Sequence, residues 1–279
     1  MQVRDFLFYW HLANYTKGFK EQAAAWQQLQ THRGDEQLDP AWLTPQQRAL
    51  LAADDLRHEA RVQYAHTRFM TRLDAAYPPR LEESFEPPSV LFYRGDWAAL
   101  NHLCLAVVGA RRAGKYSGDA LKRLGQSMPP VTIISGLAAG ADTLAHEFAL
   151  LHGWPTVAVI ANGLDIAYPA TGLQLQQTIA RVGLVISEYP LGVRPKPYRF
   201  VARNRIIAGL AHGVLVTEAA AHSGSLITAN LALQANREVF AVPNRIDAPL
   251  GIGTNALIQA GAKSVLTGDN IMEELRFYP

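Results

Sequence analysis

The sequence has a single cysteine, Cys104, among its 279 residues. One cysteine cannot form an internal disulfide or supply a cysteine-rich zinc site. No stretch approaches the roughly 18 apolar residues that a membrane-spanning helix requires. The apolar residues 6–10 follow Arg4 and Asp5 and precede no small-residue cleavage site, which argues against a secretory signal. We therefore expect a cytoplasmic protein without disulfides, structural metal or membrane segment.

Motifs for common cofactors and catalytic groups are also missing. The pattern G-x-x-x-x-G-K-[ST] of nucleotide hydrolases does not occur, nor does the dinucleotide fingerprint G-x-G-x-x-G. The nine histidines are scattered and have neither metal-ligand nor triad spacing. Asp165, Glu188 and Glu218 follow expected strands and could act as acids or bases, but no partner motif accompanies them. We expect no cofactor and no enzymatic activity.

The composition is that of a folded protein, with 49% hydrophobic and 18% charged residues. A chain of this length buries about three quarters of its unfolded surface, enough for one large domain and a small one. Residues 1–100 carry 11 basic and 13 acidic side chains, whereas residues 101–279 carry 15 and 11. The second region is therefore the basic one.

Hydrophobic periodicity divides the chain into three parts. Residues 1–75 show helical spacing and few strand signals, which indicates a small helical domain. Residues 76–100 contain four prolines and little periodicity, as expected of a connector that packs on the next domain. Residues 101–279 alternate helical stretches with short runs rich in Val and Ile, namely 105–108, 131–134, 156–160, 184–186, 214–216 and 239–242. Such runs predict an α/β domain with a doubly wound, mainly parallel sheet that is covered on both faces.

Ligands of open parallel sheets bind beyond the carboxyl ends of the strands, so the residues there are the candidate site. After the first run, Gly109 permits close backbone approach, and Arg111 and Arg112 can hold a phosphate. The second run continues into a small-residue loop that begins at Ser135 and Gly136. Backbone amides can line such a loop and bind an anion. Asp142, in the same segment, is expected to be a helix cap or loop brace.

Two further segments complete the expected rim. Ser223, Gly224 and Ser225 stand at a helix start, which is a second arrangement that accepts phosphate. Residues 194–205 contain five basic side chains and no acid. Prolines 190, 195 and 197 predict a loop over the first half of this segment and a helix after it. The candidate residues here are Lys196, Arg199, Phe200, Arg203, Asn204 and Arg205.

The expected site combines several cations, amide-lined loops and an aromatic ring. This combination suits a nucleic-acid strand, with its successive phosphates and bases, better than a single nucleotide. Phosphate contacts combined with base stacking are characteristic of single-stranded nucleic-acid binding. No helix or ribbon motif for reading duplex DNA is present. The competing interpretation is that Arg203 or Arg205 pairs with Glu188 or Glu218 and braces the edge of the sheet.

The order of these blocks resembles the DprA/Smf DNA-processing family. The blocks are SGLAAGADTLAH, GLDIAYP, SEYP, ARNRIIAGL, VTEAAAHSGSLITA and VFAVP, and the resemblance covers residues of about 77–265. It implies an extended Rossmann fold, a SAM-like N-terminal domain and a homodimer. It also implies that the protein binds and protects single-stranded DNA and helps load the RecA recombinase in natural transformation. Arg111, the Phe200 block and the serines 223 and 225 correspond to the family's DNA-contacting positions.

The chain departs from the family pattern at some positions. Ala110 replaces a usual serine and Ala139 a usual arginine, which puts two polar phosphate contacts in doubt. The chain ends shortly after Glu274, so we expect no C-terminal winged-helix domain. Two other hypotheses are a phosphoribohydrolase-like nucleotide-processing enzyme and an interaction scaffold. The enzymes typically carry a P-G-G-x-G-T-x-x-E loop, and this chain reads EAAAHSGSL at the corresponding edge.

Overall fold

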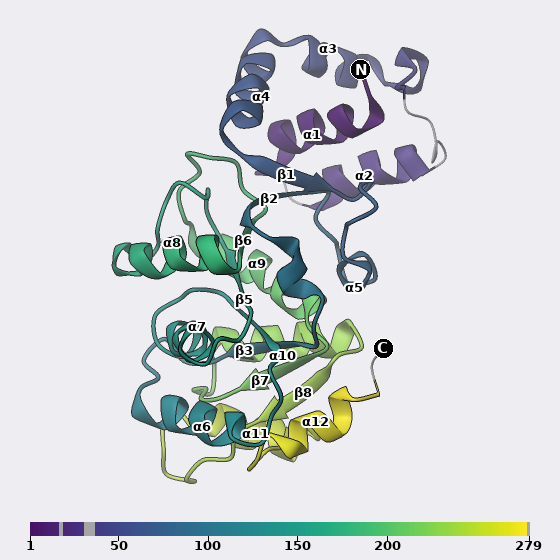
Figure 1. The fold of residues 1–279 in the computed structure, drawn as a ribbon. Helices are drawn as coiled ribbons and strands as arrows, with labels where there is room; N and C mark the ends of the chain where they lie inside the picture. The colour runs from purple at the N-terminus through teal and green to yellow at the C-terminus, as the bar shows by residue number, and fades with distance from the viewer. Residues whose placement is uncertain (17–18, 31–36, 278–279) are drawn as a thin grey trace.

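The computed structural model describes residues 1–16, 19–30 and 37–277 (Figure 1). Its N-terminal part is helical, as predicted, and comprises α1 (Val3–Asn14), α2 (Phe19–Gln30), η1 (Pro40–Trp42), α3 (Pro45–Ala52) and α4 (Asp54–His66). α3 starts with a capping box in which Thr44 and Gln47 bond each other's backbone N–H groups. These helices enclose a small core of their own that includes Phe6, Trp26 and Leu51.

The rest of the chain builds one sheet in the order β1-β2-β6-β5-β4-β3-β7-β8-β9. Six strands correspond to the six apolar runs: β3 (Cys104–Val108), β4 (Thr132–Ser135), β5 (Thr156–Ile160), β6 (Leu184–Ser187), β7 (Gly213–Val216) and β8 (Glu238–Ala241). Their pairings with one another are all parallel. The predicted doubly wound α/β fold is confirmed.

Three strands were not predicted. β1 (Arg68–Thr71) and β2 (Val90–Gly95) extend the sheet antiparallel at one edge, and β9 (Lys263–Ser264) adds a short parallel strand at the other. β2 lies within the segment expected to be a connector, which also contains α5 (Pro79–Glu82) and η2 (Trp97–Leu100). The connector is therefore partly a strand of the sheet. The division of the chain at residues 75 and 100 stays a prediction.

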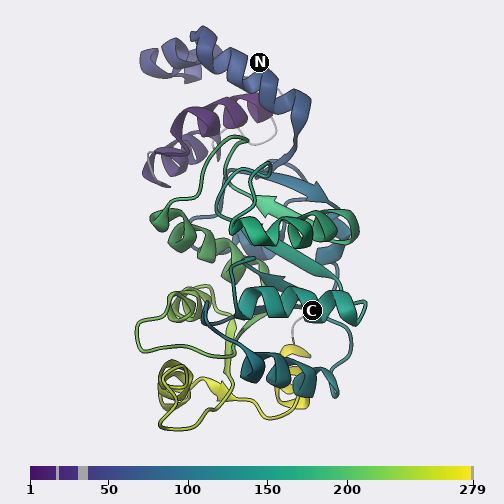
Figure 2. The same cartoon turned by 90° about the vertical axis from the view of Figure 1, so that its left-hand side faces the viewer.

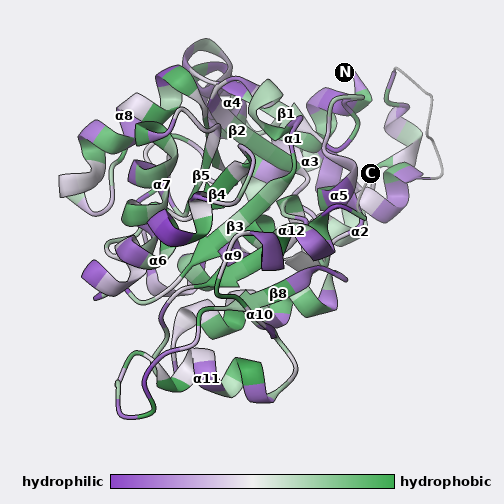
Figure 3. Ribbon diagram, turned by 60° about the horizontal axis from the view of Figure 1, so that its bottom comes forward, coloured by the Kyte–Doolittle hydropathy of each residue, from purple (hydrophilic) through white to green (hydrophobic). Residues whose placement is uncertain are grey.

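Helices cover both faces of the sheet, as Figures 1 and 2 show. One face packs against α9 (Pro197–Leu210), α10 (Gly224–Gln234) and α11 (Ile252–Gln259). The other face packs against α6 (Lys115–Gly125), α7 (Ala141–Leu151), α8 (Leu173–Val182) and α12 (Asp269–Leu275). Within β3, Leu105 and Val107 face the second set while Ala106 and Val108 face the first. This two-sided burial explains the unbroken apolar character of the central strands, visible in Figure 3.

The N-terminal helices pack against the β1–β2 edge of the sheet. Phe8 of α1 stacks on Phe69 of β1 with ring centroids 4.2 Å apart, and it also contacts Phe92 of β2. His11 Nε2 lies 2.8 Å from the carbonyl oxygen of Glu188. Within the described ranges, no helix is both long and apolar enough to cross a bilayer.

The sheet has one topological switch point. From β3 the chain proceeds through β4 and β5 to β6 on one side, and it then returns to place β7 on the other side of β3. Loops that leave neighbouring strands in opposite directions open a crevice at the carboxyl ends. The site is therefore expected beyond β3 and β7.

Candidate nucleic-acid interface

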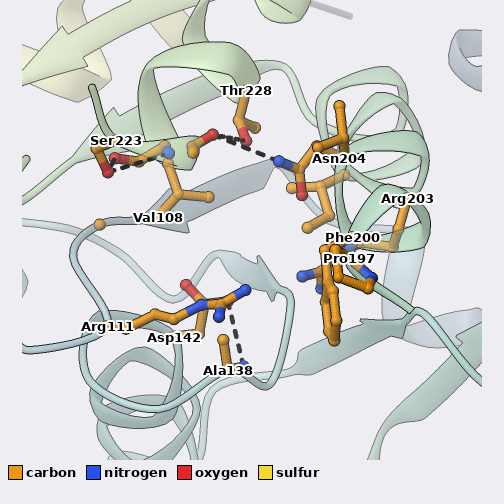
Figure 4. Close-up of a pocket in the computed structure, with 15 residues that line it drawn as sticks. Val108, Arg111, Ala138, Asp142, Pro197, Phe200, Arg203, Asn204, Ser223 and Thr228 are labelled. Carbon is orange, nitrogen blue, oxygen red and sulfur yellow. Dashed lines mark hydrogen bonds between the residues drawn. The ribbon is translucent and has the colours of Figure 1, made fainter. Parts of the chain in front are cut away.

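A cavity of about 310 Å³ opens at this switch point (Figure 4). It lies between the loop after β3, the start of α7, and helices α9 and α10. We call it the switch-point pocket. Its lining consists of Val108, Gly109, Arg111, Ala138, Asp142, Pro197, Phe200, Val201, Arg203, Asn204, Ile207, Ser223, Gly224, Ser225 and Thr228. Four separate segments of the sequence thus converge on one pocket.

Arg111 is the exposed cation of the pocket. It extends from the loop after β3 toward α9, and its Cζ atom lies 5.2 Å from the ring centroid of Phe200 (Figure 4). The other neighbour of Phe200 is Tyr168, whose ring centroid is 5.3 Å away. The loop that carries Arg111 is tightly seated, because a Cβ atom on Gly109 would lie 2.6 Å from that of Ala141. A cation beside two aromatic rings can contact a phosphate while a base stacks.

The N-terminus of α10 forms the opposite wall. Ser223 caps this helix, since its Oγ accepts a hydrogen bond from Ser225 N at 3.3 Å, and the two hydroxyls lie 2.7 Å apart. Asn204 on α9 donates from Nδ2 to the Gly224 carbonyl at 3.4 Å. Gly224 has open space where a Cβ atom would be. Backbone N–H groups and the positive end of the helix dipole therefore face the pocket, an arrangement suited to an anion.

Arg203 forms the buried floor of the pocket and is only 4% exposed. Its Nη1 donates to the Val159 carbonyl, and its Nε has no hydrogen-bond partner. Gly136 makes room for it, since a Cβ atom at that position would lie 1.8 Å from Nη1. The predicted loop glycine thus acts through Arg203 and does not itself line the pocket.

Asp142 is the only carboxylate among the pocket residues, and it lies 7% exposed on α7. Burial raises its pKa, an effect that the nearby Arg203 opposes. Burial likewise lowers the pKa of Arg203, with Asp142 opposing and Arg111 adding to the shift. Asp142 also accepts a hydrogen bond from Ala138 N at 3.3 Å, which fulfils the expected role of loop brace. Asp142 was not among the binding residues predicted from the sequence. Its position two residues after Gly140, at the start of a helix, was a signal that could have identified it.

The structure changes the interpretation of the basic segment. α9 begins at Pro197, because proline is well tolerated at the first helical position. Arg199 was expected on a loop, but it lies in the first turn, 4% exposed, with Nη1 bonded to the Arg194 carbonyl at 2.5 Å and Cζ 4.9 Å from the Tyr189 ring. That expectation was wrong. Arg203 and Arg205 lie in the middle of the helix, as the predicted helix over the second half of the segment requires.

Arg205 forms an ion pair with Glu188, as the competing interpretation of the sequence proposed. Its Nη2 lies 2.6 Å from Glu188 Oε1, and the two side chains are 4% and 5% exposed. It does not line the pocket. The pair joins α9 to the end of β6, so the structure gives Arg205 a bracing position.

Three more predicted residues lie outside the pocket lining. Ser135 is fully buried, and its hydroxyl donates to the Val107 carbonyl at 2.6 Å. Arg112 and Lys196 are exposed, and Lys196 precedes α9 as its N-cap residue. The structure thus brings Gly109, Arg111, Phe200, Arg203, Asn204, Ser223, Gly224 and Ser225 together, and it leaves the other six predicted residues around them.

The remaining strand-end carboxylates have structural partners. Glu218 accepts a hydrogen bond from Ser117 at 2.8 Å, and Glu188 holds Arg205. Both oxygens of Asp165 lie 3.0 Å from Gly192 N. None of the three lines the switch-point pocket. The pair of carboxylates that glycosidic-bond chemistry usually needs is therefore not assembled there.

Comparisons with known proteins identify the family of this chain. The model of the family described as DNA recombination-mediator protein A matches residues 68–276. The DNA processing protein DprA of Streptococcus pneumoniae is 44% identical over 206 residues, 74% of this chain and 73% of that protein. The Smf protein of Escherichia coli is 43% identical over 205 residues, and the match spans 72% of this chain but 54% of that protein.

Solved structures show the same similarity. The crystal structure of S. pneumoniae DprA has a TM-score of 0.86 at 34% identity, covering 96% of this chain and 97% of that one. DNA processing protein A of Helicobacter pylori, described in terms of its single-stranded DNA binding mode, has a TM-score of 0.65 at 30% identity and covers 76% and 98%. By family model, sequence and fold, this chain belongs to the DNA recombination-mediator protein A family, which includes the DprA and Smf proteins.

Proposed function

We propose that this protein binds single-stranded DNA without sequence preference and that the switch-point pocket holds part of the strand. One observation carries the proposal: Arg111 beside the Phe200 ring faces the amide-bearing N-terminus of α10 across a single open pocket. A phosphate can bind between the guanidinium and the helix end while a base stacks on the ring. The H. pylori relative, with its single-stranded DNA binding mode, supports the same reading.

The pocket favours an anion, although Asp142 and Arg203 are both buried in it. Arg203 has one N–H without a partner, and the exposed Arg111 has no carboxylate within ion-pair distance among the described residues. The carboxylate of Asp142 is engaged by the Ala138 amide. The guanidinium of Arg111 is therefore the charge that faces the opening of the pocket.

The test is a titration of a fluorescent oligonucleotide at two salt concentrations. We expect affinity to fall with salt, and Arg111→Ala to reduce the logarithmic salt slope by about 0.7, the value for one phosphate contact on a single strand. Lys122→Ala, an exposed cation on α6 away from the pocket, is the matched control. If Arg111→Ala leaves both affinity and slope at wild-type values, the strand lies elsewhere.

We further infer a non-enzymatic role in which the protein forms a homodimer, protects incoming strands and helps load RecA in the cytoplasm. This inference rests on the family resemblance. Light scattering with and without DNA tests the dimer, and nuclease protection of a bound oligonucleotide tests the shielding role. Release of free base from nucleoside monophosphates would instead support the phosphoribohydrolase alternative.

A further inference from the structure

A second basic surface lies along α8, on the opposite face of the sheet from α9 and α10. It consists of two cavities of about 590 Å³ each, which adjoin because Arg94 and Ala180 line both. The first extends along α8 from Leu173 to Arg181, and the second continues past Gly95 to the end of α4 and the start of β1. Figure 2 shows α8 running across this side of the molecule. We call the two cavities together the α8 groove.

The groove carries more positive than negative charge. Arg94, Arg181 and Arg68 line it and are exposed, and no ion pair with a carboxylate is found for any of them among the described residues. The one carboxylate in the lining is Asp165, which already accepts from Gly192 N. Single exposed arginines without a carboxylate partner are common on protein surfaces. Three that line one continuous groove create a positive potential that suits a polyanionic ligand.

A buried acceptor in the same groove also lacks a partner. Gln176 is 6% exposed, and its Nε2 donates to the Leu164 and Ile166 carbonyls. Its Oε1 has no hydrogen-bond partner. That oxygen is closed off from the open groove, so the groups that the groove offers to a strand are its arginines.

The groove begins close along the chain to a residue that contacts the switch-point pocket. Tyr168, which contacts Phe200 of the pocket, lies five residues before Leu173, where the groove begins. From Leu173 to Arg181 the helix rises about 12 Å, a length that a short stretch of single strand can follow. A strand that leaves the pocket over Tyr168 can therefore follow α8.

We propose that the α8 groove is a second contact surface for single-stranded DNA, in which Arg94 and Arg181 bind phosphates of the strand that leaves the switch-point pocket. This proposal rests on the proposed function. It predicts that affinity depends on oligonucleotide length, because a short oligonucleotide fills only the pocket. A longer one reaches the arginines of α8 and β2.

The test compares oligonucleotides of about 4 and about 16 nucleotides, the range of site sizes for single-strand binding modules. The variant is Arg94→Glu with Arg181→Glu, and the control is Lys122→Glu with Arg276→Glu, which changes net charge equally at exposed positions outside the groove. We expect the groove variant to lose tenfold or more in affinity for the longer oligonucleotide. Its logarithmic salt slope should fall by about 1.4, and the shorter oligonucleotide should bind unchanged. The control should bind both as the wild type does.

Equal affinity and slope of groove variant and wild type on the longer oligonucleotide would overturn the proposal while leaving the pocket intact. If the wild type binds neither oligonucleotide, the proposed function itself fails, and the groove proposal with it. Arg94→Ala with Arg181→Ala is the second variant, in case charge reversal disturbs folding. Melting temperatures of all variants should match the wild type, since the substituted side chains are exposed.

Discussion

A substitution of Arg205 distinguishes two roles for this residue. The sequence predicts that Arg205 binds DNA, whereas the structure pairs it with Glu188 in the interior. Removing one partner leaves the other charge buried, which typically costs about 3–5 kcal/mol. At about 2–4 °C per kcal/mol for a domain of this size, Arg205→Ala should lower the melting temperature by about 6–20 °C. If Arg205 contacted DNA instead, the variant would fold normally and bind DNA with a reduced salt slope.

Two comparisons sharpen this prediction. Arg205→Met with Glu188→Leu removes both charges, and we expect most of the lost stability to return, because well-packed apolar replacements of buried pairs are often neutral. Arg245→Ala removes an ion pair with Asp247 whose side chains are 79% and 63% exposed, and it should cost less than about 1 kcal/mol. Thermal unfolding by circular dichroism measures all three, and anisotropy with an oligonucleotide is recorded well below each melting point. Wild-type stability combined with weakened DNA binding in Arg205→Ala would refute the assignment.

Three other predictions concern the pocket, the glycine that supports its floor, and a buried histidine. Phe200→Ala should weaken oligonucleotide binding by about 1–3 kcal/mol at unchanged salt slope, as anisotropy titrations at two salt concentrations will show, because the ring stacks a base and carries no charge. Gly136→Ala should lower both stability and affinity, since the new methyl group would displace the Arg203 guanidinium, whereas Gly118→Ala meets only Leu144 at 3.9 Å and should lower neither. Urea unfolding and titration on both variants test this difference. Burial lowers the pKa of His146 to about 3, whereas its pKa in the unfolded chain is about 6.5. Between these two pH values, a proton binds His146 mainly in the unfolded state. The free energy of unfolding should therefore drop by up to about 1.4 kcal/mol per pH unit between pH 6 and 4, and urea titrations should show a shallower drop in His146→Gln.

In these tests, particular outcomes contradict the structure. A fall in melting temperature without a change in affinity would make Phe200 a packing residue. Equal behaviour of the two glycine variants would mean that Arg203 does not rest on Gly136. Parallel pH profiles for wild type and His146→Gln would show that this histidine is not held neutral by burial.

The central sheet could be predicted because its strands are buried on both faces. Residues 156–160 and 214–216, for example, contain no polar alternation, and a short apolar run of this kind has few other stable placements. The edge strands carry a weaker signal. β2 reads VLFYRG, and its last two residues, which have no partner in β1, are only partly buried or exposed. Its neighbouring prolines made a connector the natural interpretation.

The candidate site could be predicted as a set of loops, since strand ends and glycines mark them along the chain. Which side chains enter the pocket depends on contacts that one segment does not specify. Ser135 looked like a phosphate ligand, yet its hydroxyl is used by the Val107 carbonyl on the neighbouring strand. Arg205 meets Glu188 only after α9 packs against the end of β6.

The register of α9 nevertheless contained the information that separates its arginines. Residues three or four positions apart share a helix face, so Arg199 and Arg203 belong to the face of Ile206 and Leu210, which are buried against the sheet. Phe200 and Asn204 follow the adjacent row, which borders α10 and the pocket. A guanidinium on the apolar face must be bonded internally or must pass through the core to reach a ligand. Arg199 is bonded internally, whereas Arg203 bonds the Val159 carbonyl and also lines the floor of the pocket. Counting cations along the sequence therefore overestimates the positive charge that is exposed at the site.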